Sequence, residues 1–183
     1  MKDSIMFTLE SWPVLAPAFL IFLVVMIVKG KKLMLRQMTL LTAFAVYVAG
    51  VIHFTFFPLE VNIGIYANQT PWYQTINYIP ILTIDAKTFL LNIIMFIPLG
   101  MFLPLLNQGV KSVKRIAQIG FYSCLGIELI QSVIKITLGS GRSTDINDLL
   151  ANTLGAVIGF LLIRSVMKVT FIKEQLTPFK LQG

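Results

Sequence analysis

A short stretch in the last third of the chain holds most of the side chains that could carry out chemistry. It reads Glu128-x2-Gln131 and then Arg142-x2-Asp145-x2-Asp148-x3-Asn152. Carboxylates serve as general acids, bases or hydrogen-bond acceptors, and a guanidinium holds a phosphate or carboxylate through two parallel hydrogen bonds. The surrounding sequence is strongly apolar, and an Asp at the centre of a membrane span costs ~2.5–3.5 kcal/mol. Ionisable residues in such a place are functional candidates.

The composition predicts a single membrane domain over residues 1–183. Of the 183 residues, 56% are apolar and 13% are charged, and the mean hydropathy is +0.82. A bilayer then replaces the buried core that a soluble protein of this length would build. The single cysteine, Cys124, can form neither an internal disulfide nor a cysteine metal cluster. The net charge of +7 comes from short basic clusters without a continuous basic face, so nucleic acid is not an expected partner.

Five apolar stretches are long enough to cross, or nearly cross, ~30 Å of hydrocarbon as helices. They are residues 12–28, 38–59, 88–106, 116–136 and 149–167. The first is read as an uncleaved anchor, because basic residues follow it directly instead of preceding it. We therefore expect an all-α polytopic bundle of about five transmembrane helices. Four spans with one half-inserted segment are the alternative.

The positions of the charges predict the orientation of the bundle. If the N-terminus lies outside, eleven of the fifteen cations fall on the cytoplasmic side, where Glu174 is the only acid. These cations are Lys29, Lys31, Lys32, Arg36, Lys111, Lys114, Arg115, Arg164, Lys168, Lys173 and Lys180. The outer side then holds four cations and seven acids. We therefore expect the N-terminus outside and the C-terminus in the cytoplasm.

The linker of residues 60–87 between the second and third spans is rich in tyrosine, tryptophan and proline. Amphipathic aromatic rings prefer the level of the lipid head groups. The linker is therefore expected to lie on, or dip into, the outer membrane interface.

Polar residues of the fourth and fifth spans form two stripes that are expected to face each other. The fourth-span residues recur at helical spacing and share one face. They are Cys124, Glu128, Gln131 and Lys135. The fifth-span residues fall within an arc of about 80°. They are Asp145, Asp148, Asn152, Gly155 and Gly159. The short linker makes these spans antiparallel neighbours, and Thr144 or Asp145 can cap the fifth helix.

Other polar groups are expected at the same depth. Asn92 begins the third span at its outer end, and His53 lies in the outer third of the second. Pro98 removes an amide hydrogen from the third span and favours a kink that could line a pocket. We therefore expect a cavity near the extracytoplasmic surface, reached from outside or from the outer leaflet.

Four motifs follow one another along the chain. They are Asn77-x-Ile79-Pro80, Asn92-x3-Phe96-Ile97-Pro98-Leu99-Gly100, Glu128-x2-Gln131 and Arg142-x2-Asp145-x2-Asp148-x3-Asn152-Thr153-x-Gly155-x3-Gly159. Together they resemble the VanZ-like family of small bacterial membrane proteins, over residues 38–165. The family's namesake is associated with low-level resistance to teicoplanin, a lipoglycopeptide that binds cell-wall precursors outside the membrane. The resemblance implies a plasma-membrane protein acting on the envelope side, without implying a reaction.

The charged candidates also have structural interpretations. Glu128 and Gln131 could fix helix register, and Asp145 could serve only as a helix cap. Arg142 could pair with Glu128 or Asp148 instead of binding the anion of a ligand.

The same holds for the remaining candidates. Asn92 and Asn152 could join helices by hydrogen bonds, and His53 could be a packing residue. Gly155 and Gly159 predict a close helix contact, within the bundle or between two copies of the chain.

The predicted site has seven main residues and three secondary ones. The main candidates are Asn92, Glu128, Gln131, Arg142, Asp145, Asp148 and Asn152. The secondary candidates are His53, Asn77 and Pro98. No cofactor or bound metal is expected, because the sequence lacks a histidine-rich metal motif and a phosphate loop.

Three classes of function stay open. The preferred one is a bacterial envelope protein that lowers sensitivity to teicoplanin-like drugs by binding drug, lipid-linked precursor or surface lipid. The second is a small intramembrane enzyme that uses paired carboxylates and Arg142 on a lipid head group, with Asp145 and Asp148 able to hold a divalent cation. The third is a transporter or channel subunit, which would need an oligomer because no inner polar path is evident. Expected partners are membrane lipids and the two envelope ligands, with a homo-oligomer possible through Gly155 and Gly159.

Overall fold

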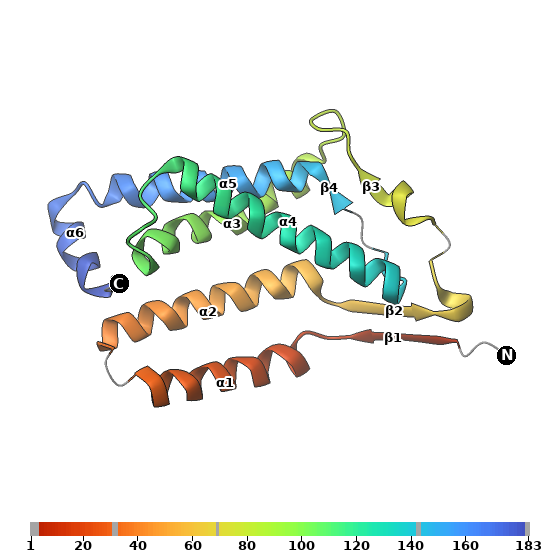
Figure 1. The fold of residues 1–183 in the computed structure, drawn as a ribbon, viewed down its shortest axis with the longest axis horizontal. Helices are drawn as coiled ribbons and strands as arrows, with labels where there is room; N and C mark the ends of the chain where they lie inside the picture. The colour runs from red at the N-terminus through yellow and green to blue at the C-terminus, as the bar shows by residue number, and fades with distance from the viewer. Residues whose placement is uncertain (1–3, 31–32, 69, 142–143, 182–183) are drawn as a thin grey trace.

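The computed structural model is an elongated bundle of helices (Figure 1) that describes residues 4–30, 33–68, 70–141 and 144–181. Its helices are α1 (Trp12–Lys29), α2 (Leu35–Phe56), α3 (Ala86–Leu106), α4 (Val113–Leu138), α5 (Ile146–Val166) and the short α6 (Thr170–Leu176). Five of the helices in these ranges are long and apolar enough to cross a membrane. The all-α polytopic bundle is confirmed, and each predicted span boundary lies within three residues of a helix end.

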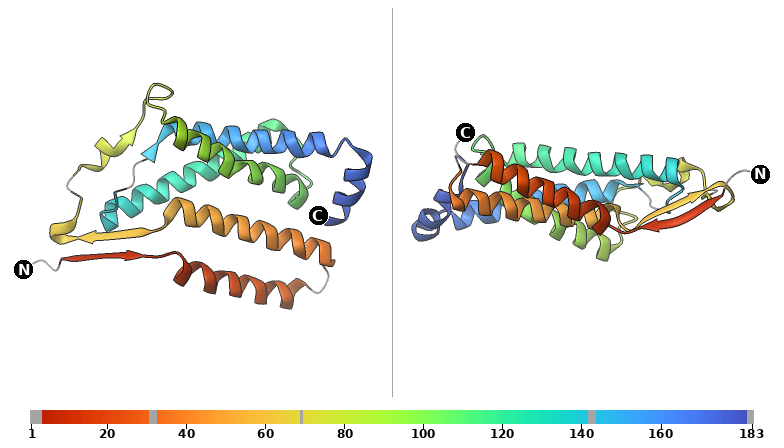
Figure 2. Two further views of the ribbon diagram at one scale, coloured as in Figure 1. Left: turned by 180° about the vertical axis from the view of Figure 1, so that it is seen from behind. Right: turned by 90° about the horizontal axis from the view of Figure 1, so that it is seen from below.

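The long helices lie side by side along the long axis of the molecule, and the two chain ends lie at opposite ends of it (Figure 1, Figure 2). Helix α5 packs most extensively against α3 and also against α4, whereas α1 packs chiefly against α2. No residue of α1 is buried. Helix α1 is therefore peripheral, with a surface that suits lipid on most sides, and the packed centre belongs to α3, α4 and α5.

Close backbone contact joins α3 to α5. A Cβ atom placed on Gly155 would overlap the carbonyl oxygen of Ile93, and one on Gly159 would overlap that of Ile97. From the other side, Gly100 leaves room for the backbone of α5. The predicted small-residue contact is thus made within the bundle, and α3 occupies the face on which a second copy was considered. The oligomeric state itself stays a prediction.

The buried core lies where these three helices meet. It consists of Phe96, Val110, Ile116, Cys124, Ala156 and Phe160. Cys124 is fully buried and is not disulfide-bonded. The thiol therefore acts as a small core group, and it also accepts a hydrogen bond described below.

Short strands at the end that carries the N-terminus were not predicted from the sequence (Figure 1). Strand β1 (Ile5–Leu9) pairs antiparallel with β2 (Leu59–Ile63), and β3 (Ile76–Asn77) pairs in parallel with β4 (Thr144–Asp145). Two 3-10 turns, η2 (Gly64–Tyr66) and η3 (Trp72–Thr75), lie between β2 and β3. The linker after α2 is therefore tied both to the N-terminal segment and to the start of α5.

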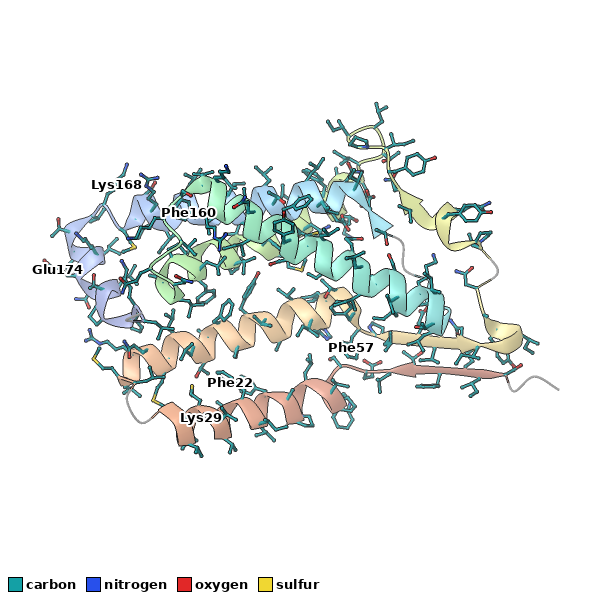
Figure 3. The ribbon with its side chains drawn as sticks, viewed as in Figure 1. Phe22, Lys29, Phe57, Phe160, Lys168 and Glu174 are labelled. Carbon is teal, nitrogen blue, oxygen red and sulfur yellow. The ribbon has the colours of Figure 1, made fainter. Side chains whose placement is uncertain are left out.

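At the opposite end the C-terminal segment folds back onto the bundle. After α6 and the 3-10 turn η4 (Thr177–Phe179), the carbonyl of Lys180 accepts a hydrogen bond from the Gln37 side chain at 3.0 Å. The charged side chains of Lys29, Lys168 and Glu174 lie towards this same end (Figure 3). It is the end for which the charge pattern predicts a cytoplasmic position.

The predicted orientation can be tested by cysteine labelling on intact cells. Asn68 lies in the linker at the end of the bundle that carries the N-terminus, and Lys111 lies in the α3–α4 loop at the opposite end. Both are exposed. We expect a membrane-impermeant maleimide to label the Asn68→Cys variant and to label Lys111→Cys only after the membrane is opened. The unaltered chain is the control, because its Cys124 is fully buried. The reverse pattern would contradict the orientation.

The α3–α5 contact predicts an asymmetry between two glycines. Gly159→Ala should lower the free energy of unfolding of the purified chain by ~1–3 kcal/mol, because the backbone of α3 must move to admit the methyl group. Thermal unfolding is the measurement. Gly126→Ala is the matched control, since nothing lies within 4 Å of its added Cβ. It should be neutral or stabilising. Equal loss of stability in both variants would show that the close contact is unimportant.

Candidate functional site

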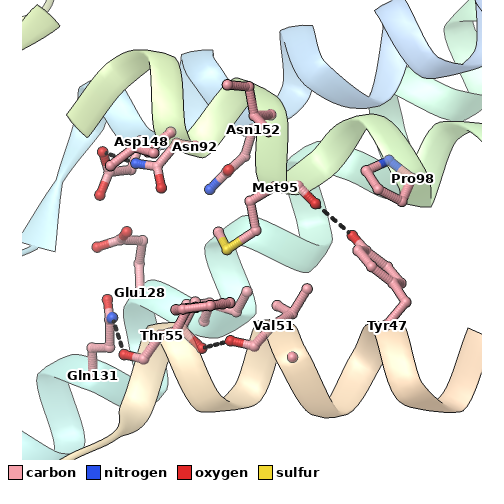
Figure 4. A pocket seen from close by; sticks show the side chains of 15 residues that line it. Tyr47, Val51, Thr55, Asn92, Met95, Pro98, Glu128, Gln131, Asp148 and Asn152 are labelled. Carbon is pink, nitrogen blue, oxygen red and sulfur yellow. Dashed lines mark hydrogen bonds between the residues drawn. The ribbon is translucent and has the colours of Figure 1, made fainter. Parts of the chain in front are cut away.

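A cavity of about 620 Å³ lies between α2, α3, α4 and α5 (Figure 4). Five of its polar lining residues belong to the predicted site and come from three of these helices. They are Asn92, Glu128, Gln131, Asp148 and Asn152. The rest of the lining is mainly apolar and comes from α2, α3 and α4, with Pro98 among it. The two polar stripes predicted for the fourth and fifth spans therefore do meet, together with the N-terminal half of α3.

The stripe on α4 reaches its neighbours through Glu128 and Gln131. Glu128 is 3% exposed, and its Oε2 atom accepts a hydrogen bond from the backbone amide of Asp145 at 3.2 Å. The Gln131 side chain donates to the backbone carbonyl of Thr55 at 2.8 Å. Residues three apart on a helix share a face, so one carboxyl ties α4 to the start of α5 while the amide ties α4 to α2.

Asn92 and Asp148 join α3 to α5 at the polar end of the cavity. The Asn92 Nδ2 atom donates to Oδ1 of Asp148 at 2.5 Å (Figure 4). Asp148 lies in the first turn of α5, where the free backbone amides of a helix favour a carboxylate. A hydrogen bond between two side chains is the usual way in which a polar pair is accommodated between helices in lipid.

Asn152 lies one turn further along α5. Its side chain is 3% exposed, and Nδ2 donates to the Cys124 sulfur at 2.9 Å. The Oδ1 atom is buried and receives no hydrogen bond from any residue that the structure describes. The sequence predicted Asn152 as a site residue but gave no role to the thiol that holds it.

The wall formed by α2 was missed by the sequence analysis. The Tyr47 hydroxyl donates to the backbone carbonyl of Met95 at 3.0 Å, beside the position where Pro98 interrupts the hydrogen bonds of α3. Tyr47, Val51 and Thr55 are each one turn apart and line the cavity. Their helical spacing was the available signal, but they look like ordinary residues of an apolar span.

A hydrogen-bonded cap closes the N-terminal end of α5. Asp145 is the N-cap residue, as predicted, and accepts from the amide of Asn147 at 2.8 Å. Its other oxygen accepts from Asn77 Nδ2 at 3.0 Å. Asn147 in turn accepts from the backbone amide of Ile81 at 2.9 Å. Asp145 and Asn77 therefore lie outside the cavity lining and hold the linker onto α5.

Two further candidates lie away from the cavity or outside the described residues. His53 is placed next to Ser11, with 2.8 Å between Nδ1 and Oγ, and does not line the cavity. The sequence predicted its position along α2, but its side chain points towards the segment before α1 instead of into the cavity. Arg142 falls outside the part of the chain that the structure describes.

The electrostatic character of the cavity follows from these residues. Glu128 and Asp148 are the two carboxyl groups of the lining, and the described lining holds no lysine, arginine or histidine. No group of three His, Cys, Asp or Glu residues suited to a metal ion occurs among the described positions. The arrangement can accept hydrogen bonds and attract positive charge at one end while it offers an apolar surface elsewhere.

The Asn92–Asp148 pair makes a testable contribution to stability. Asn92→Leu should lower the free energy of unfolding by ~1–3 kcal/mol, because it leaves the Asp148 carboxyl without its donor. The double variant Asn92→Leu/Asp148→Leu should be less destabilised than the sum of the two single variants, as measured by thermal unfolding. Additive losses would show that the two side chains do not interact.

The sequence model of the VanZ/LLP1 family matches residues 44–171. This range covers well over half of the chain and contains every residue that lines the cavity. Neither the curated proteins nor the solved structures contain a significant match. With its helices of spanning length, the chain is a multi-pass membrane protein that belongs to the VanZ/LLP1 family.

Proposed function

We propose that this chain is a bacterial cell-membrane protein that lowers sensitivity to teicoplanin-like lipoglycopeptide antibiotics, and that it acts through the cavity lined by α2, α3, α4 and α5. The observation that carries the proposal is the composition of that cavity. Five of the seven main site candidates line it, and the other walls are largely apolar. Its ligand is the drug, a lipid-linked cell-wall precursor or a surface lipid. All three combine polar groups with an apolar chain.

The position of the cavity supports action on the envelope side. Asp148 lies in the first turn of α5, and Asn92 lies near the start of α3. Both helix ends face the side that the charge pattern predicts to be extracytoplasmic. A lipoglycopeptide reaches its precursor targets from that side, so a site at this depth can meet either the drug or its target without transport across the membrane.

The size of the cavity supports binding of part of a larger amphiphile. At about 620 Å³ it lies within the range of ~300–1,000 Å³ that is common for small-molecule sites. Such a volume can hold a chain segment and the polar group next to it. The bulk of a lipoglycopeptide or of a precursor saccharide would then lie outside the bundle.

A second candidate function is an intramembrane enzyme that acts on a lipid head group. It is favoured by the presence of two carboxyl groups, Glu128 and Asp148, in the lining of one cavity. Each is held by a hydrogen bond, from Asp145 and Asn92 respectively, which would fix it for acid or base catalysis. Mass analysis of envelope lipids and precursors separates the two functions, because only an enzyme leaves a covalently altered product.

The proposed function predicts that protection depends on the carboxyl groups themselves. Glu128→Gln and Asp148→Asn should each abolish most of the reduction in teicoplanin sensitivity, with the amount of protein in the membrane unchanged. Glu174→Gln, on the exposed α6 and remote from the cavity, should keep full protection. Minimum inhibitory concentration and quantitative immunoblotting are the measurements. Protection that falls only in step with protein amount would show that the carboxyl groups are scaffold.

A further inference from the structure

The hydrogen-bond donors in the cavity wall are largely used by the protein itself. Each donating polar side chain of the lining gives a hydrogen bond to another protein atom. The bonds run from Tyr47 to the Met95 carbonyl, from Thr55 to the Val51 carbonyl, from Gln131 to the Thr55 carbonyl, from Asn92 to Asp148 and from Asn152 to the Cys124 sulfur. The two hydroxyl groups have no further hydrogen to offer. The carboxamides of Gln131, Asn92 and Asn152 each keep one N–H, so the free donors of the wall are uncharged amide hydrogens.

Acceptors are also left over, and two of the three belong to acidic side chains. Glu128 accepts through Oε2 and Asp148 through Oδ1, and the second oxygen of each receives no hydrogen bond from a described residue. Asn152 Oδ1 is buried and is likewise without a donor in the described chain. Buried acceptors are normally paired, and Asn152 Oδ1 is a buried acceptor without a described donor. Together with the two carboxyl oxygens that line the same cavity, it indicates a ligand that brings hydrogen atoms. Asn152 is an independent observation here, because its amide carries no charge.

The charge of the lining selects among hydrogen-bond donors. Glu128 and Asp148 line the cavity without a basic side chain among its described neighbours. A phosphate or carboxylate head group placed between them would meet charges of its own sign. A hydroxyl group offers one hydrogen and no charge. A primary ammonium offers three N–H donors and a positive charge, which matches three acceptors of which two are acidic.

The rest of the cavity fits an alkyl chain. Beside the polar end the lining includes Val51, Leu91, Ile94, Met95 and Ile127. Leu91 and Ile94 are more than half exposed, and so is Phe54 on α2. Because these exposed lining residues lie on α2 and α3, which contact each other little, the cavity opens between these two helices towards the lipid.

We propose that the cavity binds an amphiphile whose head group is a primary ammonium, with the ammonium among Glu128, Asp148 and Asn152 and the chain between α2 and α3. This inference deepens the proposed function and rests on it for its role in the cell. Two sources share the chemistry: an amino lipid of the outer leaflet and an amino group on a lipoglycopeptide.

The test uses the full-length chain, purified in detergent, with dodecylamine as the probe and native mass spectrometry and thermal unfolding as readouts. Dodecyl phosphate and dodecanol are the matched ligands with the same chain. We expect dodecylamine to bind at least about tenfold more tightly than either, since its head group alone supplies both a positive charge and several N–H donors. Equal or tighter binding of dodecyl phosphate or dodecanol overturns the proposal.

Variants separate specific binding from partition into detergent. Glu128→Gln and Asp148→Asn should each weaken dodecylamine binding about tenfold, and Glu174→Gln should leave it unchanged. Gly50→Leu fills the chain portion of the cavity, and Gly126→Leu is its control: an added Cβ meets nothing within 4 Å at either glycine, and only Gly50 lines the cavity. Binding should be lost in Gly50→Leu alone. Binding that is unaffected by all the cavity variants overturns the proposal, and thermal unfolding without ligand checks that each variant is folded.

Competition identifies the source of the head group. Displacement of dodecylamine by phosphatidylethanolamine, but not by phosphatidylcholine, supports a membrane lipid, and displacement by teicoplanin supports the drug. Displacement by neither overturns the proposal. These assays are independent of the susceptibility measurement. Ammonium binding in a chain whose cavity variants still protect cells would refute the proposed function alone, whereas protection without ammonium binding would refute this inference alone.

Discussion

The close contact between the backbones of α3 and α5 determines the rest of the architecture. Gly155 meets the carbonyl of Ile93, the residue directly after Asn92, so the helices are closest where the polar pair has to form. With bulkier residues in that contact, the Asn92 amide would be held further from the Asp148 carboxyl in a lipid environment that supplies no water in its place. Packing of small residues thus lets the Asn92 donor reach the Asp148 carboxyl, which in turn lines the cavity.

Polar groups on the two sides of the start of α5 differ in how far their hydrogen-bonding capacity is used. On the side of the linker, Asn77, Asp145 and Asn147 bond mainly to one another and to the linker, so their side chains are used in holding the cap together. On the side of the cavity, Glu128 and Asp148 each make a single hydrogen bond with described residues. A carboxylate has room for about four hydrogen bonds. Asp145 and Asp148, which belong to one motif, therefore differ in how much of their hydrogen-bonding capacity the described structure uses.

Hydropathy and charge were sufficient to predict the five spans, because crossing lipid requires a long apolar helix whatever the tertiary fold. Helical spacing also placed Glu128 and Asp148 on facing stripes. Spacing cannot show what lies on the third side of a cavity, so Tyr47 and Thr55 were passed over. It also cannot fix the direction of an isolated side chain, which is why His53 was placed in the site although it contacts Ser11. Strands β1 and β2 were missed because their pairing joins segments about fifty residues apart.

The part of the chain that the family model matches agrees with the location of the cavity. The family match begins at residue 44, within α2, so it excludes α1 and β1 and keeps every residue that lines the cavity. Helix α1 also has no buried residue and packs chiefly against α2. If α1 formed part of the site, a polar side chain of α1 would be expected at the cavity, and none of the described lining comes from it. In the binding mode proposed above, the opening between α2 and α3 faces the bilayer, and an alkyl chain enters there without first leaving the lipid.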